Sequence, residues 1–126
     1  SEFDQRSTVS ICNSDKFRGN GFIIDVGPKT SKNFDEIIKS ADLIVWNGSL
    51  GVFEWESGQK GTVKLLKSIE ENNTAKSYAG GGSTIEAINR LGKKEVFTHI
   101  SSGGGAFLEL LESGTLAGIK NLYKEV

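Results

Sequence analysis

Two runs of three glycines, each lying between a strand-like and a helix-like segment, constrain the fold of this chain most strongly. The apolar segment Ala75–Ala79 stops at Gly80–Gly82, and a helical pattern begins directly after these glycines. The same order returns where Phe97–Ile100 leads through two serines into Gly103–Gly105 and a Leu-rich helical segment. Two consecutive strand–glycine loop–helix units indicate a nucleotide or phosphate site at one edge of a parallel sheet.

Strand-like and helix-like segments alternate along the chain, and this alternation predicts a Rossmann-like α/β fold. We expect a parallel sheet of about four strands with helices on both faces, joined by right-handed crossovers. The expected strands are Phe22–Val26, Leu43–Trp46, Ala75–Ala79 and Val96–Ile100. The expected helices begin at a Thr30 or Ser31 cap, span Gln59–Asn72 and Ser83–Leu91, and follow Gly105. The wholly apolar strand Leu43–Trp46 should be buried on both faces.

The composition excludes several classes of protein. The net charge of −1 gives no reason for binding nucleic acid or an anionic membrane. The longest apolar run is about five residues, far short of the ~20 that span a membrane. A single cysteine, Cys12, rules out an internal disulfide and fits a reducing compartment. No secretory signal is visible, and the absence of methionine suggests that this chain does not begin at a natural start.

Three loops should meet at one edge of the predicted sheet. Loops that follow neighbouring parallel strands emerge on the same side, so we expect Asn47–Glu56, Gly80–Gly82 and Ser101–Gly105 to face a shared cleft. The glycines could expose backbone N–H groups to phosphate oxygens, or could merely allow tight turns. Neither run fits a P-loop or the dinucleotide-binding glycine pattern.

Several side chains in these loops have two interpretations. Ser83 and Thr84 could cap the following helix, bind phosphate, or do both. Glu54 could accept hydrogen bonds from ribose hydroxyls or be a solvated glutamate. The aromatic residues near it could line an adenine pocket or pack in the core; these are Trp46, Phe53 and Trp55. His99 has no neighbouring cysteine or second histidine, so we expect a packed core residue rather than a metal ligand.

Four motifs in order carry a resemblance to a known family. They are Asp25–Thr30, Val45–Glu54, Gly80–Gly82 and His99–Ala106. Together they closely resemble the C-terminal part of phosphoglycerate kinase, and the similarity runs from about Gly21 to Leu122. On this basis residues 1–20 form an irregular N-terminal segment, and residues 21–126 form the C-terminal part of a nucleotide-binding domain.

The resemblance implies a two-lobed cytoplasmic glycolytic transferase, monomeric at full length. The family transfers a phosphoryl group between 1,3-bisphosphoglycerate and ADP, giving 3-phosphoglycerate and ATP, with Mg2+. Its C-terminal lobe binds ATP or ADP, while the glycerate requires the N-terminal lobe. By resemblance, the nucleotide-binding residues are Asn47, Ser49, Gly51, Val52, Glu54, Gly80, Gly81, Gly82, Ser83 and Thr84, and the residues facing the transferred phosphoryl group are Gly103, Gly104 and Gly105.

The chain departs from the family pattern in three ways. Ser83 stands where the family usually has an aspartate that helps to hold magnesium, and a hydroxyl is a much weaker ligand for this cation. Ser49 and Ala117 replace prolines, which should loosen the local backbone. The glycerate-binding lobe has no counterpart here, so we expect the chain alone to be inactive. The alternative is a catalytically degenerate relative that serves as a nucleotide-binding or protein-interaction module.

Overall fold

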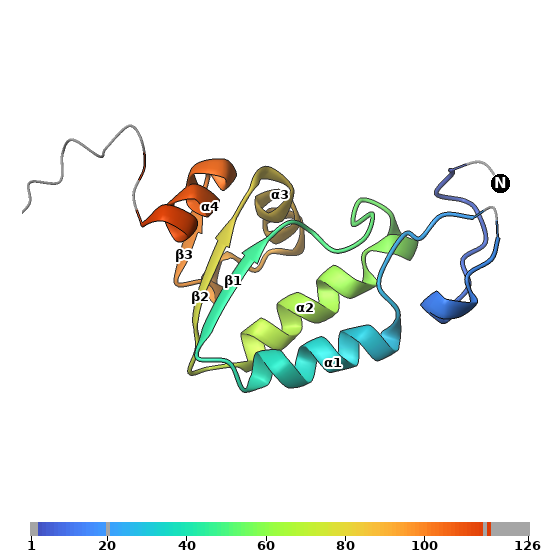
Figure 1. Cartoon of the computed structure of the whole chain (residues 1–126), viewed down its shortest axis with the longest axis horizontal. Helices are drawn as coiled ribbons and strands as arrows, with labels where there is room; N and C mark the ends of the chain where they lie inside the picture. Colours follow the sequence, from blue (N-terminus) through green and yellow to red (C-terminus); the bar gives the residue numbers. More distant parts are fainter. Residues whose placement is uncertain (1–2, 20, 115, 117–126) are drawn as a thin grey trace, which may run out of the picture. The chain divides into compact units, whose positions relative to one another are not determined.

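The computed structural model describes residues 3–19, 21–114 and 116, and these residues form an α/β fold (Figure 1). The regular elements are α1 (Pro28–Lys39), β1 (Leu43–Asn47), α2 (Lys60–Glu71), β2 (Lys76–Gly80), α3 (Gly82–Leu91), β3 (His99–Ser101) and α4 (Gly104–Ser113). Short 3-10 turns occupy Ser14–Lys16, Glu56–Gly58 and Lys94–Val96. The tail predicted over Leu116–Val126, with Ala117, lies outside the described residues apart from Leu116.

The strands form one parallel sheet in the order β1-β2-β3 (Figure 1). In the β2–β3 pair, Tyr78 lies opposite His99 and Gly80 lies opposite Ser101. The predicted α/β class with a parallel sheet is therefore confirmed. Within the described residues the sheet has three strands, one fewer than the sequence suggested.

The chain divides into two compact units, and each has its own buried residues. The first unit contains the described residues of Ser1–Ile44 together with Ser49–Lys76, and the second contains Val45–Gly48 together with the described residues of Ser77–Val126. The buried apolar residues of the first unit are Ile38, Ile44, Phe53, Leu66 and Ile69, and those of the second are Trp46, Ala79, Ala87, Ile88 and Phe97.

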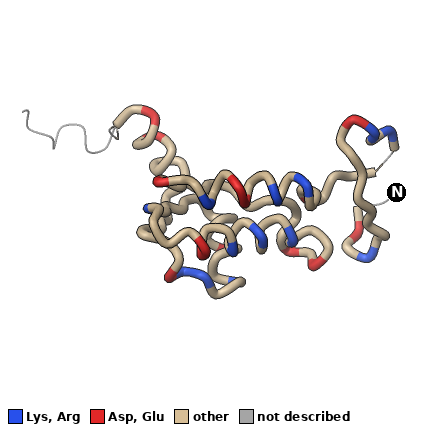
Figure 2. The backbone as a smooth tube through the Cα atoms, turned by 90° about the horizontal axis from the view of Figure 1, so that it is seen from below, with Lys and Arg blue, Asp and Glu red and all other residues tan. Residues whose placement is uncertain are grey.

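Helices α1 and α2 pack side by side in the first unit (Figure 1). The Asp35 carboxylate accepts a hydrogen bond of 2.6 Å from the Ser68 hydroxyl and pairs with Lys39 at 3.0 Å and Lys64 at 3.2 Å. The hydrogen bond from Ser68 and the two ammonium groups hold the pKa of Asp35 well below its usual range. Figure 2 shows how acidic and basic residues are interspersed along these helices. Contacts between charged and polar side chains thus link α1 to α2, whose outer faces are exposed to solvent.

In the second unit, the side chain of Trp46 joins the end of β1 to the segment before β3. Its ring stacks on Phe97 with 6.0 Å between ring centroids. Its indole N–H donates a 2.6 Å hydrogen bond to the Gly48 carbonyl, so this buried polar group is satisfied. Trp46 therefore packs in the core and fixes the direction in which the chain leaves β1.

The strand predicted at Phe22–Val26 is wrong. This segment pairs with no strand of the described residues, and Phe22 and Ile23 are exposed. Its polar groups instead make loop contacts, since the Ile24 carbonyl accepts the Val52 N–H at 2.8 Å. The Asp25 carboxylate accepts N–H groups as well, which a strand ladder does not provide.

The predicted burial of Leu43–Trp46 on both faces is also wrong. Ile44 and Trp46 are buried, but Leu43 is 61% exposed and Val45 is 42% exposed. Burial on both faces requires a layer on each side of a strand. The described residues supply that layer only for the side of Ile44 and Trp46.

The starts of two elements and the burial of one side chain differ from the sequence prediction. Helix α1 begins at Pro28, where the fixed φ of proline suits a first helical position, and not at a Thr30 or Ser31 cap. The Lys94–Val96 turn leaves only His99–Ser101 for β3. His99 is exposed, which contradicts the prediction of a packed core histidine.

Candidate functional site

The ends of all three strands meet in the second unit around Asn47, Gly81 and Gly104. The Asn47 side-chain amide donates to the Gly104 carbonyl at 3.5 Å. A Cβ atom on Gly104 would lie only 2.6 Å from the Gly81 Cα, and one on Gly81 would lie 2.9 Å from the Asn47 Oδ1. Only glycine therefore fits at position 104, where the close neighbour is backbone, whereas a side chain at position 81 would meet the Asn47 side chain. The two glycine loops therefore meet at Asn47, the first residue of the long loop, whereas the shared cleft expected for all three loops stays a prediction.

Helices α3 and α4 begin directly at these glycines. The position before α3 is Gly81, with φ at +94°, which side chains rarely adopt, and the position before α4 is Gly103. Neither helix has a side-chain cap or an acidic residue in its first turn. The first N–H groups of a helix have no partner within it, and they carry partial positive charge. Both helix starts can therefore accept an anion.

Ser83 and Thr84 lie inside the first turn of α3, so neither is its cap. Ser83 is exposed. Thr84 is fully buried, and its hydroxyl accepts the Gly48 N–H at 2.7 Å. Thr84 thus connects α3 to the chain leaving β1, whereas Ser83 presents its hydroxyl to solvent at the glycine loop.

The rest of the long loop belongs to the first unit, where buried Thr62 holds it. The Thr62 hydroxyl accepts the Leu50 N–H at 3.0 Å and donates to the Leu50 carbonyl at 2.6 Å. Phe53 is 2% exposed, so it packs in the core, while Glu54 is exposed. The structure thus places Ser49, Gly51, Val52 and Glu54 on one anchored loop.

Two positioning residues were missed by the sequence analysis, Asp25 and Thr62. Both take backbone hydrogen bonds that fix the long loop and the start of α2. The sequence signal for Asp25 is a single carboxylate inside the apolar run Phe22–Val26. Thr62 gives no such signal, because a threonine on the inner face of a helix is common.

The donor groups of the described residues do not fit a magnesium ion held by the protein. No group of three or more His, Cys, Asp or Glu side chains comes together among them. At the glycine loop the exposed side-chain oxygens are neutral, the hydroxyl of Ser83 and the amide oxygen of Asn47. Magnesium favours carboxylates and phosphate oxygens, so a bound nucleotide would itself have to carry the metal.

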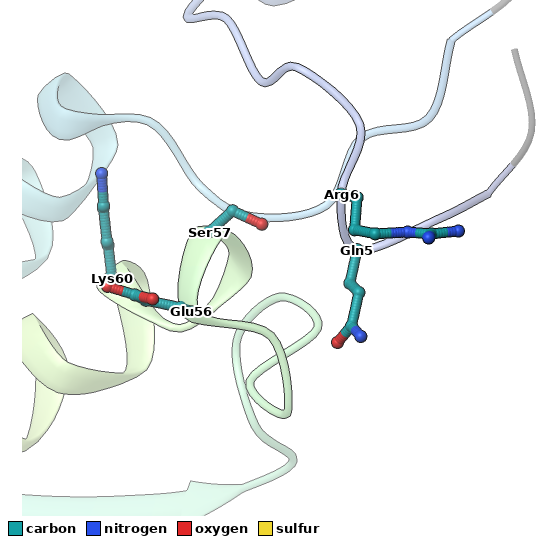
Figure 3. Close-up of a pocket in the computed structure, with 5 residues that line it drawn as sticks. All are labelled: Gln5, Arg6, Glu56, Ser57 and Lys60. Carbon is teal, nitrogen blue, oxygen red and sulfur yellow. The ribbon is translucent and has the colours of Figure 1, made fainter.

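A cavity of about 480 Å³ lies in the first unit beside the 3-10 turn Glu56–Gly58 (Figure 3). Its lining residues are Gln5, Arg6, Glu56, Ser57 and Lys60. Arg6 already pairs with the Asp4 carboxylate at 2.7 Å. No residue predicted for the nucleotide site lines this cavity, and the sequence analysis assigned it no role.

A parallel sheet whose strands end in glycine loops, each loop opening a helix, defines a Rossmann-like α/β unit with anion-accepting helix starts. The family model described as phosphoglycerate kinase matches residues 1–114. The chain belongs to the phosphoglycerate kinase family.

Similar proteins agree in both sequence and fold. The phosphoglycerate kinase of Dictyoglomus turgidum is 43% identical over 118 residues, covering 94% of this chain and 30% of that protein. The one from Leptospira biflexa is 48% identical over 99 residues, covering 79% of this chain and 25% of that protein. The structure of the Coxiella burnetii enzyme superposes with a TM-score of 0.83 at 37% identity, covering 89% of this chain and 29% of that one. The chain thus spans less than a third of these relatives.

Among the described helices, none is both long and apolar enough to cross a lipid bilayer.

Proposed function

We propose that this chain forms the nucleotide-binding region of a phosphoglycerate kinase. In that role it binds ADP or ATP while a phosphoryl group moves between 1,3-bisphosphoglycerate and ADP, giving 3-phosphoglycerate and ATP. The observation that carries the proposal is the meeting of Asn47, Gly81 and Gly104 at the ends of three strands. Ligands of parallel α/β sheets bind at this edge.

Each predicted residue has a role in this proposal. Ser49, Gly51 and Val52 line the nucleoside with Asn47, and the exposed Glu54 accepts hydrogen bonds from ribose hydroxyls. Gly80, Gly81, Gly82 and Ser83 follow the nucleotide phosphates, with Thr84 supporting them through its bond to Gly48. Gly103, Gly104 and Gly105 direct the start of α4 at the transferring phosphoryl group.

In phosphoryl transfer, this region positions the nucleotide and stabilises negative charge. It supplies neither a nucleophile nor a base. Phosphoryl transfer spreads negative charge over the equatorial oxygens, and fixed N–H donors stabilise that charge. The uncapped starts of α3 and α4 supply such donors. When bound with the nucleotide, magnesium would add further charge neutralisation; the residues described above bind and orient the phosphates.

The full reaction requires more than this chain. Residues 21–126 constitute the C-terminal part of the nucleotide-binding domain, residues 1–20 an irregular leading segment, and the glycerate site belongs to a separate N-terminal lobe. We therefore propose a cytoplasmic enzyme of glycolysis, monomeric at full length, and no turnover by this chain alone. Its partner is the nucleotide, with no role for nucleic acid or membrane.

The serine at position 83, where the family usually has an aspartate, favours a second candidate function. A relative that had lost its metal-holding carboxylate could persist as a nucleotide-binding or protein-interaction module. The retained glycine loops and the anchored Glu54 loop argue for a working nucleotide site. The two candidates differ in what nucleotide binding gains from magnesium.

Calorimetric titration of ADP, with and without magnesium, tests the proposal on the native chain and on Ser83→Asp. We expect ADP binding by both proteins, with Ser83→Asp tighter than the native chain only when magnesium is present, because a carboxylate ligates the metal and repels bare phosphates. The matched control is Thr30→Asp, which adds a carboxylate to the first turn of α1, a helix of the first unit. A folded native chain that binds no ADP would refute the proposal.

A further inference from the structure

We propose that Asp25 is the positioning residue of the nucleoside loop, defined here as Leu50–Gly58. This inference rests on the proposed function, because it concerns how that loop is held in the shape that receives a nucleoside. Asp25 is half-buried in the first unit and was given no role by the sequence motifs. Its contacts connect the loop to α2.

The carboxylate of Asp25 caps α2 from a distant part of the chain. One oxygen accepts the Gly61 N–H at 2.7 Å, and the other accepts the Val26 N–H at 2.8 Å. Gly61 is the second residue of α2, whose own N-cap residue Gln59 makes no side-chain cap. The first turn of α2 has no acidic residue, so Asp25 supplies the negative charge that a helix start favours.

The nucleoside loop is packed directly against this cap. The Val52 N–H donates to the carbonyl of Ile24, the neighbour of Asp25, at 2.8 Å. Gly51 has φ at +63°, and a Cβ there would lie 2.5 Å from the Gly58 carbonyl, 2.6 Å from the Ile24 carbonyl and 2.7 Å from the Asp25 Oδ1. Only glycine therefore fits at position 51, because a side chain there would meet these three oxygens and would have to adopt a positive φ.

The close contact with Gly61 restricts the position of the Asp25 carboxylate. A Cβ on Gly61 would collide with the Asp25 carboxylate and lie 2.6 Å from the Val26 Cγ2. The close approach serves the hydrogen bond from the Gly61 N–H to the carboxylate. The Asp25 carboxylate thus holds the chain after Gly58 through Gly61, and its bond to the Val26 N–H fixes the segment whose Ile24 carbonyl holds Val52.

The main test compares Asp25→Asn with the matched control Asp35→Asn. Asparagine keeps the shape of Asp25 but turns an N–H donor toward one of two backbone N–H groups. Asp35 also joins two helices through its carboxylate, but it makes none of the loop contacts. We expect ADP affinity to fall about tenfold in Asp25→Asn, because a tenfold change corresponds to the loss of one hydrogen bond to a charged group. The ADP affinity of Asp35→Asn should stay unchanged.

Two further measurements separate positioning from a general loss of structure. Tripolyphosphate binding should be equal in Asp25→Asn and the native chain, because that ligand contacts the glycine loops and not the nucleoside loop. Amide hydrogen exchange at Val52 and Gly61 should become faster in Asp25→Asn only. Gly61→Ala displaces the carboxylate without removing it, so it should also weaken ADP binding and speed the exchange at Val52 and Gly61. It replaces Asp25→Asn in these measurements if Asp25→Asn does not fold.

Each result bears on one claim. Equal ADP affinities in the two asparagine variants, or unchanged exchange at Val52 and Gly61, would overturn the role of Asp25. A native chain that binds no ADP would refute the proposed function instead. In that case faster exchange in Asp25→Asn would still support the anchoring of the loop.

Discussion

Substituting Gly104 by alanine probes the contact on which the candidate site depends. The new Cβ would lie 2.6 Å from the Gly81 Cα and 3.0 Å from the Gly81 N. Carbon atoms in favourable contact are about 3.5–4.0 Å apart, so the two glycine loops would have to separate. Because both partners are backbone, no side-chain rotation relieves the collision. Gly105 lies in the same first turn of α4, and a Cβ there would meet no atom within 4 Å.

The two alanine variants should therefore differ in the free energy of unfolding. Alanine is favoured over glycine in a helix by up to about 1 kcal/mol, and this gain is common to both variants. Only Gly104→Ala adds the cost of overpacking, about 1–3 kcal/mol. The propensity gains cancel, so Gly104→Ala should be less stable than Gly105→Ala by about 1–3 kcal/mol.

Urea denaturation of the two variants measures this difference, and calorimetry with ADP measures its consequence. We expect Gly105→Ala to unfold at a higher urea concentration than the native chain, and Gly104→Ala at a lower one than Gly105→Ala. Gly104→Ala should also bind ADP more weakly, since its loops no longer converge. Equal unfolding midpoints for the two variants would refute the close approach of Gly104 to Gly81.

Two further predictions concern the first unit. Thr62→Val should lower the free energy of unfolding by about 1–3 kcal/mol, because it leaves both backbone groups of Leu50 without their partner, and Thr62→Ser should recover most of this loss in urea denaturation. The lowered pKa of Asp35 predicts stability that is present above the ordinary aspartate pKa of about 3.9 and is lost as the pH falls below it. Thermal unfolding between about pH 4 and pH 2 should therefore depend less on pH in Asp35→Asn than in the native chain, and parallel curves would contradict this linkage.

Local patterns were sufficient to predict the helices and the glycine loops. The apolar spacing predicted α2 over Gln59–Asn72, and the observed helix spans Lys60–Glu71. The change from an apolar run to glycine predicted the ends of β2 and the start of α3. The topological rule for parallel strands then placed the loops after the strands at one sheet edge, and the hydrogen bond from Asn47 to Gly104 agrees with this for the end of β1 and the loop after β3.

Long-range hydrogen bonds account for most of what the sequence did not predict. The apolar composition of Phe22–Val26 suits a strand, but the bond from Val52 to Ile24 makes it a support for a loop. Thr84 has the chemistry of a capping residue, but α3 begins before it at Gly82, and its buried hydroxyl accepts the Gly48 N–H instead. Leu43 and Val45 have the sequence of a strand covered on both faces, and only the structure shows which side is covered.

The most direct test of the central claim is to follow backbone amide resonances of the whole chain while ADP is added. We predict that the largest shifts occur at the glycine loops, Gly80–Ser83 and Gly103–Gly105, and on the nucleoside loop at Val52. Shifts confined to the cavity lined by Arg6 and Lys60, or no shifts in a folded chain, would contradict the assignment of the nucleotide site to the ends of the strands.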